Sequence, residues 1–182
     1  MTPTLVFCSS LEEGILSWTL DEAGAAFSAP KTVAPGKSFF LALHPKRPVL
    51  YSVNLPEGKV SAHVIQPGGA LSLLNEVESA GKAPCHLEVD AEGAYLMVAN
   101  YAGDPAIFPL DAEGRLSAAA ATLHLEGSGP DPKRQTHSHP HGITLTPEGA
   151  WVTDLGIDRI AAVTIAPGSL ALAEDRPRSV TV

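Results

Sequence analysis

One stretch of the chain, residues 130–159, gathers side chains suited to proton transfer and anion binding. Its candidates are His137, His139 and His141 at alternate positions, preceded by Arg134 and Gln135. Histidine, with an unperturbed pKa of about 6.5, can accept or release a proton near neutral pH. The planar fork of arginine fits a carboxylate or a phosphate. If the protein is an enzyme, we expect its chemistry to use this stretch.

The same histidines also allow a metal site to be considered. At positions i, i+2 and i+4 they would share one face of an extended strand, as a three-nitrogen zinc set would require. Pro140 within the run argues against a regular ladder strand, and no nearby carboxylate is an evident partner for such ligands. We therefore expect no metal and no cofactor.

Composition narrows the class of protein. The chain has 182 residues, 45% of them hydrophobic, and a net charge of −8, which suits one globular domain and argues against a nucleic-acid surface. Cys8 and Cys85 are too few for a disulfide framework, and both are expected to be reduced core residues. The first residues show no basic leader, and no apolar run could span a membrane. We expect a cytoplasmic protein without a membrane partner.

The elements that must position these residues repeat along the chain. Three segments share a pattern of apolar strand, turn, second apolar strand and a closing Asn or Asp. They are Phe39–Asn54, Cys85–Asn100 and His141–Asp154. A third strand and a turn follow each of them. The closing glycines are Gly24, Gly69, Gly114 and Gly168, at spacings of 45, 45 and 54 residues.

Units of about 45 residues with four short strands are typical of propeller blades. We predict an all-β fold, a β-propeller of four-stranded antiparallel blades, with the first unit lacking its innermost strand. Residues 1–182 would form a single partial propeller domain, whose blade repeats end near residues 24, 69, 114 and 168. An open arc would expose sheet faces and a free edge. We therefore interpret the chain as the N-terminal fragment of a longer propeller.

Four stretches resemble the lactonase family of seven-bladed propellers. They are Ser38–Pro45, Gly81–Asp104, Gly127–Gly149 and Thr153–Ile160. The succession RQ, HPH and DLGxDR is the specific part of this similarity. The resemblance implies that about four of seven blades are present. It also implies hydrolysis of 6-phosphogluconolactone in the pentose phosphate pathway, with a small sugar lactone, expected to be phosphorylated, as the partner.

By this resemblance, His141 begins the innermost strand and is the first candidate for the general base or acid, with His139 second. Arg134 and Gln135 are candidates for holding the lactone or its phosphate. His86 is a further pocket candidate, although alignment through the turn glycines puts His141 opposite Cys85.

Structural roles are also expected for acidic and basic residues of the same region. Asp154 is retained as a substrate-binding candidate, although capping of a turn is the favoured interpretation. Asp158 and Arg159 are expected to form a surface or inter-blade ion pair. The segment Pro147–Asp154 is two residues shorter than its counterparts, so we expect a shortened strand before Asp154.

Other functions stay open. A lactonising cyclase of the muconate type would use a similar histidine and cationic clamp. A non-enzymatic propeller that binds a partner is the second class, because a fold does not fix a function. The chain on its own is expected to be inactive, and its oligomeric state cannot be predicted from the sequence.

Overall fold

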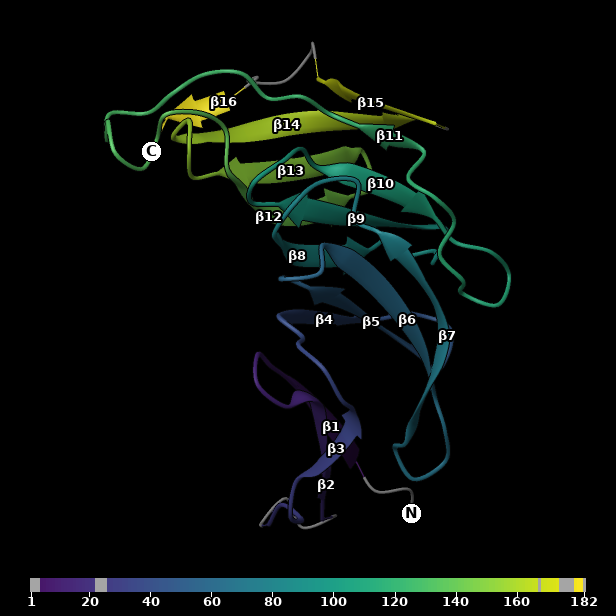
Figure 1. Cartoon of the computed structure of the whole chain (residues 1–182). Coiled ribbons are helices and arrows are strands. Elements are labelled where there is room, and N and C mark those ends of the chain that lie inside the picture. Colours follow the sequence, from purple (N-terminus) through teal and green to yellow (C-terminus); the bar gives the residue numbers. More distant parts are fainter. Residues whose placement is uncertain (1–3, 22–25, 167, 174–178, 182) are drawn as a thin grey trace.

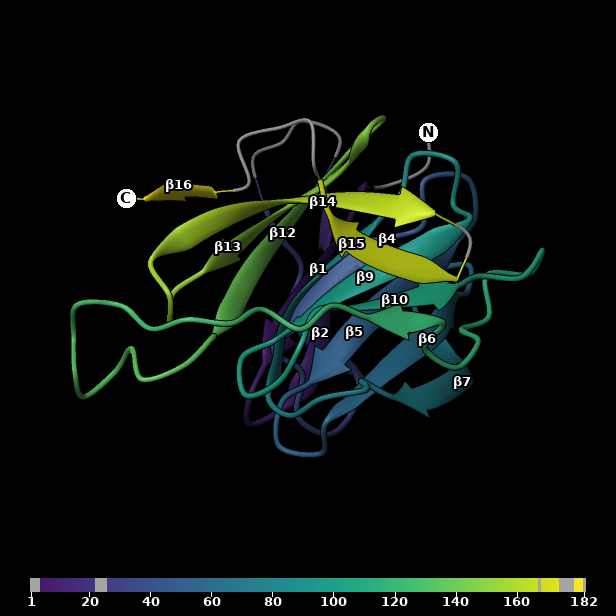
Figure 2. The same ribbon diagram turned by 90° about the horizontal axis from the view of Figure 1, so that it is seen from above.

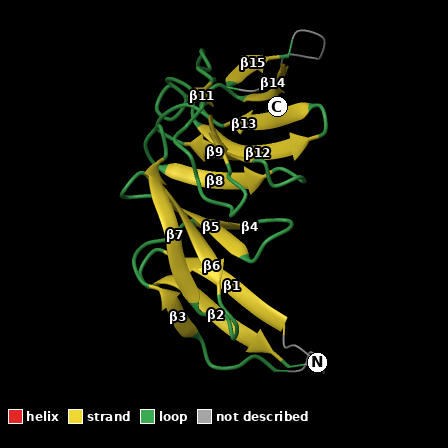
Figure 3. Cartoon of the chain, turned by 90° about the vertical axis from the view of Figure 1, so that its right-hand side faces the viewer, coloured by secondary structure: helices red, strands yellow, loops and turns green. Residues whose placement is uncertain are grey.

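A computed structural model describes residues 4–21, 26–166, 168–173 and 179–181. Over these ranges the chain forms strands and no helix, as Figure 3 shows. The predicted repeat end near residue 24 lies outside the described residues. The prediction of an all-β fold is confirmed, and that the whole chain is one partial domain stays a prediction.

The strands form four antiparallel sheets, which we call blades 1 to 4 in chain order. Blade 1 contains β1 (Thr4–Ser10), β2 (Gly14–Leu20) and β3 (Lys31–Ala34). Blade 2 contains β4 (Phe40–Leu43), β5 (Val49–Asn54), β6 (Lys59–Ile65) and β7 (Leu71–Glu78). Blade 3 contains β8 (Pro84–Val89), β9 (Tyr95–Asn100), β10 (Ala106–Pro109) and β11 (Ala121–Thr122).

Blade 4 contains β12 (Pro140–Thr146), β13 (Gly149–Asp154), β14 (Arg159–Ala166), β15 (Ser169–Leu172) and β16 (Ser179–Thr181). The last two strands pair with different halves of β14, so together they occupy one strand position. The blades follow one another as an arc (Figures 1 and 2), and β4, β8 and β12 lie side by side in neighbouring blades. Blade 1 has three strands, as its incomplete sequence repeat predicted.

The strands are rich in apolar residues, and these are buried where neighbouring blades pack face to face. In blades 2 and 3 the second strand is buried on both faces, and in each of β5 and β9 five of the six residues are buried. One cluster, which includes Tyr51, Leu87 and Phe108, fills the space between blades 2 and 3. A second cluster, which includes Met97 and Ile143, fills the space between blades 3 and 4. Burial of these side chains is the main stabilising contribution to the arc.

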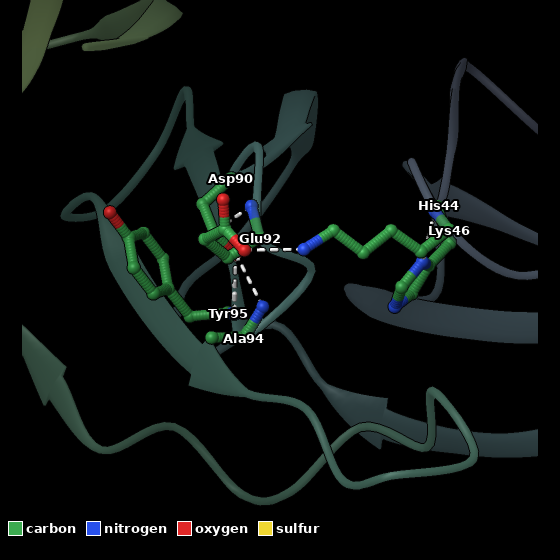
Figure 4. A network of polar contacts seen from close by, with 6 residues as sticks. All are labelled: His44, Lys46, Asp90, Glu92, Ala94 and Tyr95. Carbon is green, nitrogen blue, oxygen red and sulfur yellow. Dashed lines mark hydrogen bonds and ion pairs between the residues drawn. The ribbon is translucent and has the colours of Figure 1, made fainter. Parts of the chain in front are cut away.

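The hairpin turns of blades 2 and 3 are joined by polar contacts (Figure 4). Asp90 caps its own turn, where Oδ1 accepts hydrogen bonds from the backbone N–H groups of Ala94 (2.6 Å) and Tyr95 (2.8 Å). Lys46 of the preceding blade forms an ion pair with Glu92 of this turn. Both of those side chains are exposed, so this ion pair contributes little by itself.

The expected shortening of the strand before Asp154 was wrong. Strand β13 has six residues, as do β5 and β9, and the two missing residues are taken from the turn. A turn between Thr146 and Gly149 replaces the longer connections of blades 2 and 3. A two-residue connection is the tightest common hairpin, so the strand keeps its full register.

The prediction of a buried Cys8 was also wrong, whereas Cys85 is buried as expected. Cys8 lies on β1, the edge strand of blade 1. The next residue, Ser9, donates its hydroxyl to the carbonyl oxygen of Phe39 in blade 2 at 2.9 Å. Because side chains alternate along a strand, Cys8 points to the opposite face of the sheet.

Strands β8 and β12 begin with the same irregularity. In each, one residue is skipped in the pairing with the next strand, Cys85 in β8 and His141 in β12. This β-bulge re-aims the side chain at the start of the innermost strand. The structure therefore gives Cys85 and His141 equivalent positions, as the turn glycines predicted.

Candidate active site

His141 lies in an open hollow at the edge of blade 4. The hollow has a volume of about 450 Å³ and is lined by His141, Thr153, Asp154, Leu155, Asp158, Arg159 and Ile160. These residues come from the starts of β12 and β14 and from the end of β13 with the turn after it. The imidazole of His141 is exposed, so a substrate can reach it.

Asp154 organises the backbone beneath this hollow. Its side chain is 3% exposed. Oδ1 accepts hydrogen bonds from the backbone N–H groups of His139 (2.7 Å), Gly156 (2.9 Å) and Ile157 (3.2 Å), and Oδ2 accepts the hydroxyl proton of Ser138. A carboxylate that accepts four hydrogen bonds has little capacity left for a ligand. These contacts support the turn-capping interpretation of Asp154 over substrate binding.

His139 is held from several sides. Its ring stacks on Tyr101 at a centroid distance of 4.4 Å and lies 4.3 Å from the ring of His137. Nδ1 is 2.8 Å from the carbonyl oxygen of Tyr101, which can only accept, so the proton of the neutral ring sits on Nδ1. Gly156 lies close against it, since a Cβ there would be 2.7 Å from Cδ2 of His139 and 1.9 Å from the carbonyl oxygen of His137. His139 is thus a buried, oriented ring behind the hollow.

Gln135 is also occupied by the fold. Its Nε2 donates to the carbonyl oxygen of Leu155 at 2.8 Å, and its Oε1 accepts the backbone N–H of Asp131 at 2.9 Å. These two bonds attach the long loop before β12 to the turn between β13 and β14. Arg134, the next candidate, is exposed on the same loop. Its guanidinium forms no hydrogen bond or ion pair with any residue the structure describes, so it is free to meet an anion.

His86 lies on β8, one blade earlier. Its Nδ1 accepts the backbone N–H of Ile143 at 3.3 Å, and its ring packs against Phe40 at a centroid distance of 4.3 Å. Burial lowers the pKa of His86, and repulsion from a charged His141 lowers it further. The two histidines therefore lie near one another, on the innermost strands of adjacent blades.

The structure brings His141, Asp154, Asp158 and Arg159 into one hollow, whereas His139 is not part of its lining. No ion pair joins Asp158 to Arg159 within the described residues, contrary to the interpretation of these two residues as a pair. No group of three His, Cys, Asp or Glu residues in the described ranges could hold a metal ion.

Sequence reasoning missed two residues, Arg159 and Tyr101. Arg159 belongs to the DLGxDR motif, which was available as a signal. Tyr101 follows the last strand residue of the preceding repeat unit, and its ring lies edge-on to that of His141 at 5.9 Å. Only the packing of blade 3 against blade 4 reveals this contact.

An arc of antiparallel sheets, one with three strands and the others with four strand positions each, defines a β-propeller fold. Residues 5–182 match the family described as lactonase, 7-bladed β-propeller, and the chain belongs to that family.

Curated relatives support this assignment. The chain is 34% identical over 165 residues to a 6-phosphogluconolactonase of Bacillus subtilis, covering 87% of this chain and 47% of the relative. It is 33% identical over 132 residues to a 6-phosphogluconolactonase of Formosa agariphila, covering 68% of this chain and 37% of the relative. The chain thus spans about half, or less, of the length of these two relatives.

Solved structures show the same fold. One is a Bacteroides fragilis protein assigned provisionally as a 6-phosphogluconolactonase, with a TM-score of 0.84, 27% identity, and coverage of 99% of this chain and 55% of that chain. Another, the periplasmic gluconolactonase of Pseudomonas aeruginosa, has a TM-score of 0.85 at 23% identity, covering 98% of this chain and 55% of that chain. At this identity the second similarity concerns the fold alone. No helix in the described ranges is long and apolar enough to cross a membrane.

Proposed function

We propose that the protein is a sugar-lactone hydrolase that converts 6-phosphogluconolactone to 6-phosphogluconate. The observation that carries the proposal is the exposed imidazole of His141 in the same open hollow as the guanidinium of Arg159. Membership of the lactonase family and the names of the curated relatives support the substrate class. In this proposal the protein works in the pentose phosphate pathway in the cytoplasm.

His141 would act as the general base. Its neutral imidazole would accept a proton from water as the oxygen of that water attacks the lactone carbonyl carbon. The ring C–O bond then breaks, and the leaving alkoxide receives a proton, which the imidazolium can supply. Cationic groups or N–H donors near the carbonyl would stabilise the oxyanion that develops during attack.

The other candidates take supporting roles. The guanidinium of Arg159, with Arg134 on the neighbouring loop, would attract the phosphate, because arginine forms charge-assisted bonds with phosphate oxygens. His139 would form part of the wall behind His141, since it is stacked on Tyr101 and only 8% exposed. His86 would face the same region from the preceding blade.

The test is a kinetic comparison of the full-length protein and its His141→Ala variant on 6-phosphogluconolactone, with spontaneous hydrolysis subtracted. Loss of a general base costs about 100- to 10,000-fold in kcat. Because His141 is exposed, the melting temperature should stay unchanged. His124→Ala is the matched control, since His124 is exposed and does not line the hollow. A variant at His141 that keeps kcat within threefold would refute the assignment of the base.

The role of Arg159 is tested with two substrates. Arg159→Ala should raise KM for 6-phosphogluconolactone by about 10-fold or more, the loss of one charge-assisted anchor. The change for unphosphorylated gluconolactone should be much smaller. Equal changes for both lactones would show that Arg159 does not bind the phosphate. If neither lactone is hydrolysed but a muconate is cyclised, the proposed hydrolase activity fails.

A further inference from the structure

A second cavity, with a volume of about 350 Å³, lies between blades 1 and 2 and shares no residue with the hollow around His141. Figure 1 shows blade 1 and blade 4 at opposite ends of the arc. One wall comes from β2, β3 and residues 35–38, and the other from β5, β6 and β7. We call it the blade 1–2 cavity. No residue of β1 lines it, and the edge strands β3 and β7 contribute to its walls, so the cavity is partly open to solvent.

The floor of this cavity carries polar side chains at positions where blades 3 and 4 carry apolar ones. In blade 2, Ser52 pairs with Ser61, and Leu50 pairs with His63. The equivalent pairs in blade 3 are Val98 with Ala106 and Leu96 with Phe108. In blade 4 they are Val152 with Ala161 and Ala150 with Val163. Three positions that are apolar in blades 3 and 4 are therefore polar in blade 2, where they are Ser52, Ser61 and His63.

Two buried polar atoms of this cavity have no partner. The hydroxyl of Ser38 and Nδ1 of His63 are two of three such side-chain atoms in the described ranges, and their residues are 3% and 8% exposed. Burial lowers the pKa of His63, so its ring is neutral at pH 7 and offers an uncharged polar atom. A buried polar atom without a partner costs about 1–3 kcal/mol. Native proteins retain few such atoms, and a binding role explains this pair.

The rim indicates the chemistry of a ligand. Glu76 is held there by Lys59 at 2.6 Å and by the hydroxyl of Ser61 at 2.8 Å. Lys37 and Glu57 also line the cavity, so each sign of charge is balanced by the other. An anion would meet the carboxylates and a cation would meet the ammonium groups. A neutral molecule avoids repulsion from either kind of charge. The hydroxyl groups of such a ligand can both donate and accept hydrogen bonds.

We propose that the blade 1–2 cavity binds a small, neutral, polyhydroxylated molecule, a monosaccharide or a polyol. Ser38 and His63 would supply hydrogen bonds from the floor, and Asn54 would line its side. The volume lies near the lower end of the range for ligand pockets, which suits a single sugar ring. This site is separate from the proposed lactone site and does not depend on the proposed hydrolysis.

The test is a calorimetric titration of D-glucose into the full-length protein. A sugar ring of this size with ordinary ligand efficiency should bind with a Kd of about 1–10 mM. The double variant Ser52→Val with His63→Phe gives blade 2 the residues of blade 3 and should weaken binding at least 10-fold. Its melting temperature should be equal or higher, because polar groups in the packing are replaced by apolar ones. His124→Phe is the matched histidine control and should leave the Kd unchanged.

Two further variants keep the test decisive. Ser38→Ala removes one unpartnered hydroxyl, needs no repacking, and should weaken glucose binding several-fold if the double variant does not fold. His141→Ala should leave glucose binding unchanged. The proposal is overturned if wild type shows no saturable binding, because the cavity then holds only water. It is also overturned if His141→Ala abolishes binding, or if neither the double variant nor Ser38→Ala weakens it.

Discussion

Replacement of Asp154 separates a structural role from a ligand-binding role. In Asp154→Asn, the remaining oxygen can keep the three backbone N–H bonds, and the new amide can donate to the hydroxyl of Ser138, which rotates to accept. Four hydrogen bonds persist, but they lose the charge of the acceptor. A bond to a charged group contributes about 1.5–3 kcal/mol and a neutral one about 1 kcal/mol. At about 0.5 kcal/mol or more for each of the four bonds, we expect a loss of at least about 2 kcal/mol in the free energy of unfolding.

Asp154→Ala should be more severe. It leaves three backbone N–H groups and the Ser138 hydroxyl without an acceptor in a site that is 3% exposed. Each such group costs about 1–3 kcal/mol, so the loss is at least about 4 kcal/mol. That is a large part of the 5–15 kcal/mol that stabilises a typical protein.

The assay is urea denaturation of wild type, Asp154→Asn, Asp154→Ala and the neighbouring exposed control Thr153→Ala. The control should stay within about 0.5 kcal/mol of wild type. The order of stability should be wild type, Asn variant, Ala variant. If both variants matched wild type in stability but lost lactone binding, Asp154 would be a ligand-binding residue and our interpretation of its contacts would be wrong.

Three more predictions follow from the inner strands and turns. Folding lowers the pKa of His86, so below about pH 6.5 the unfolded state binds more protons than the folded state. The free energy of unfolding therefore decreases as the pH is lowered through this range. His86→Phe should reduce the change in denaturation midpoint between pH 7 and pH 5. A pH dependence equal to that of wild type would contradict this. Glu88→Ala removes the acceptor of the Leu145 N–H (3.1 Å) and should cost about 1 kcal/mol. Faster hydrogen exchange of the Leu145 amide, measured by NMR, would confirm the loss of this bond. Glu88→Gln, which keeps an acceptor oxygen, is the control. Gly93→Ala places a Cβ 2.2 Å from the His44 ring at φ +71° and should cost at least about 2 kcal/mol in thermal denaturation. Gly68→Ala, with φ +83° and open space, should cost about half as much.

Much of the fold could be predicted because propeller repeats are local. The alternation of Leu41 to Leu43 and the apolar run of Tyr95 to Ala99 identify strands without knowledge of their neighbours. The place of the two-residue deletion could not be read in the same way. A shorter strand and a shorter turn give the same residue count, and only the pairing of Gly149 with Thr146 distinguishes them.

The site was predicted less completely because it depends on contacts between blades. His141 was predicted, from the resemblance to the lactonase family, to begin an innermost strand, and it lies near the start of β12. Its neighbour Arg159 was assigned to an ion pair, and Tyr101 was not considered at all. The polar floor of the blade 1–2 cavity was visible in principle. An alignment of the repeats sets Ser52 and His63 against Val98 and Phe108, but their burial emerges only when blade 1 covers them.

The contacts of His86 and Glu88 with the backbone of β12 bear on how such a protein can evolve. Propellers grow by duplication of blades, and identical copies could in principle be exchanged. Here blade 3 supplies the acceptors for two amides of blade 4, at Ile143 and Leu145. At the equivalent positions blade 2 carries Phe40 and Ala42, which cannot accept a hydrogen bond. A blade inserted or shuffled between blades 3 and 4 would have to reproduce both acceptors, so these two side chains fix which neighbour blade 4 can have.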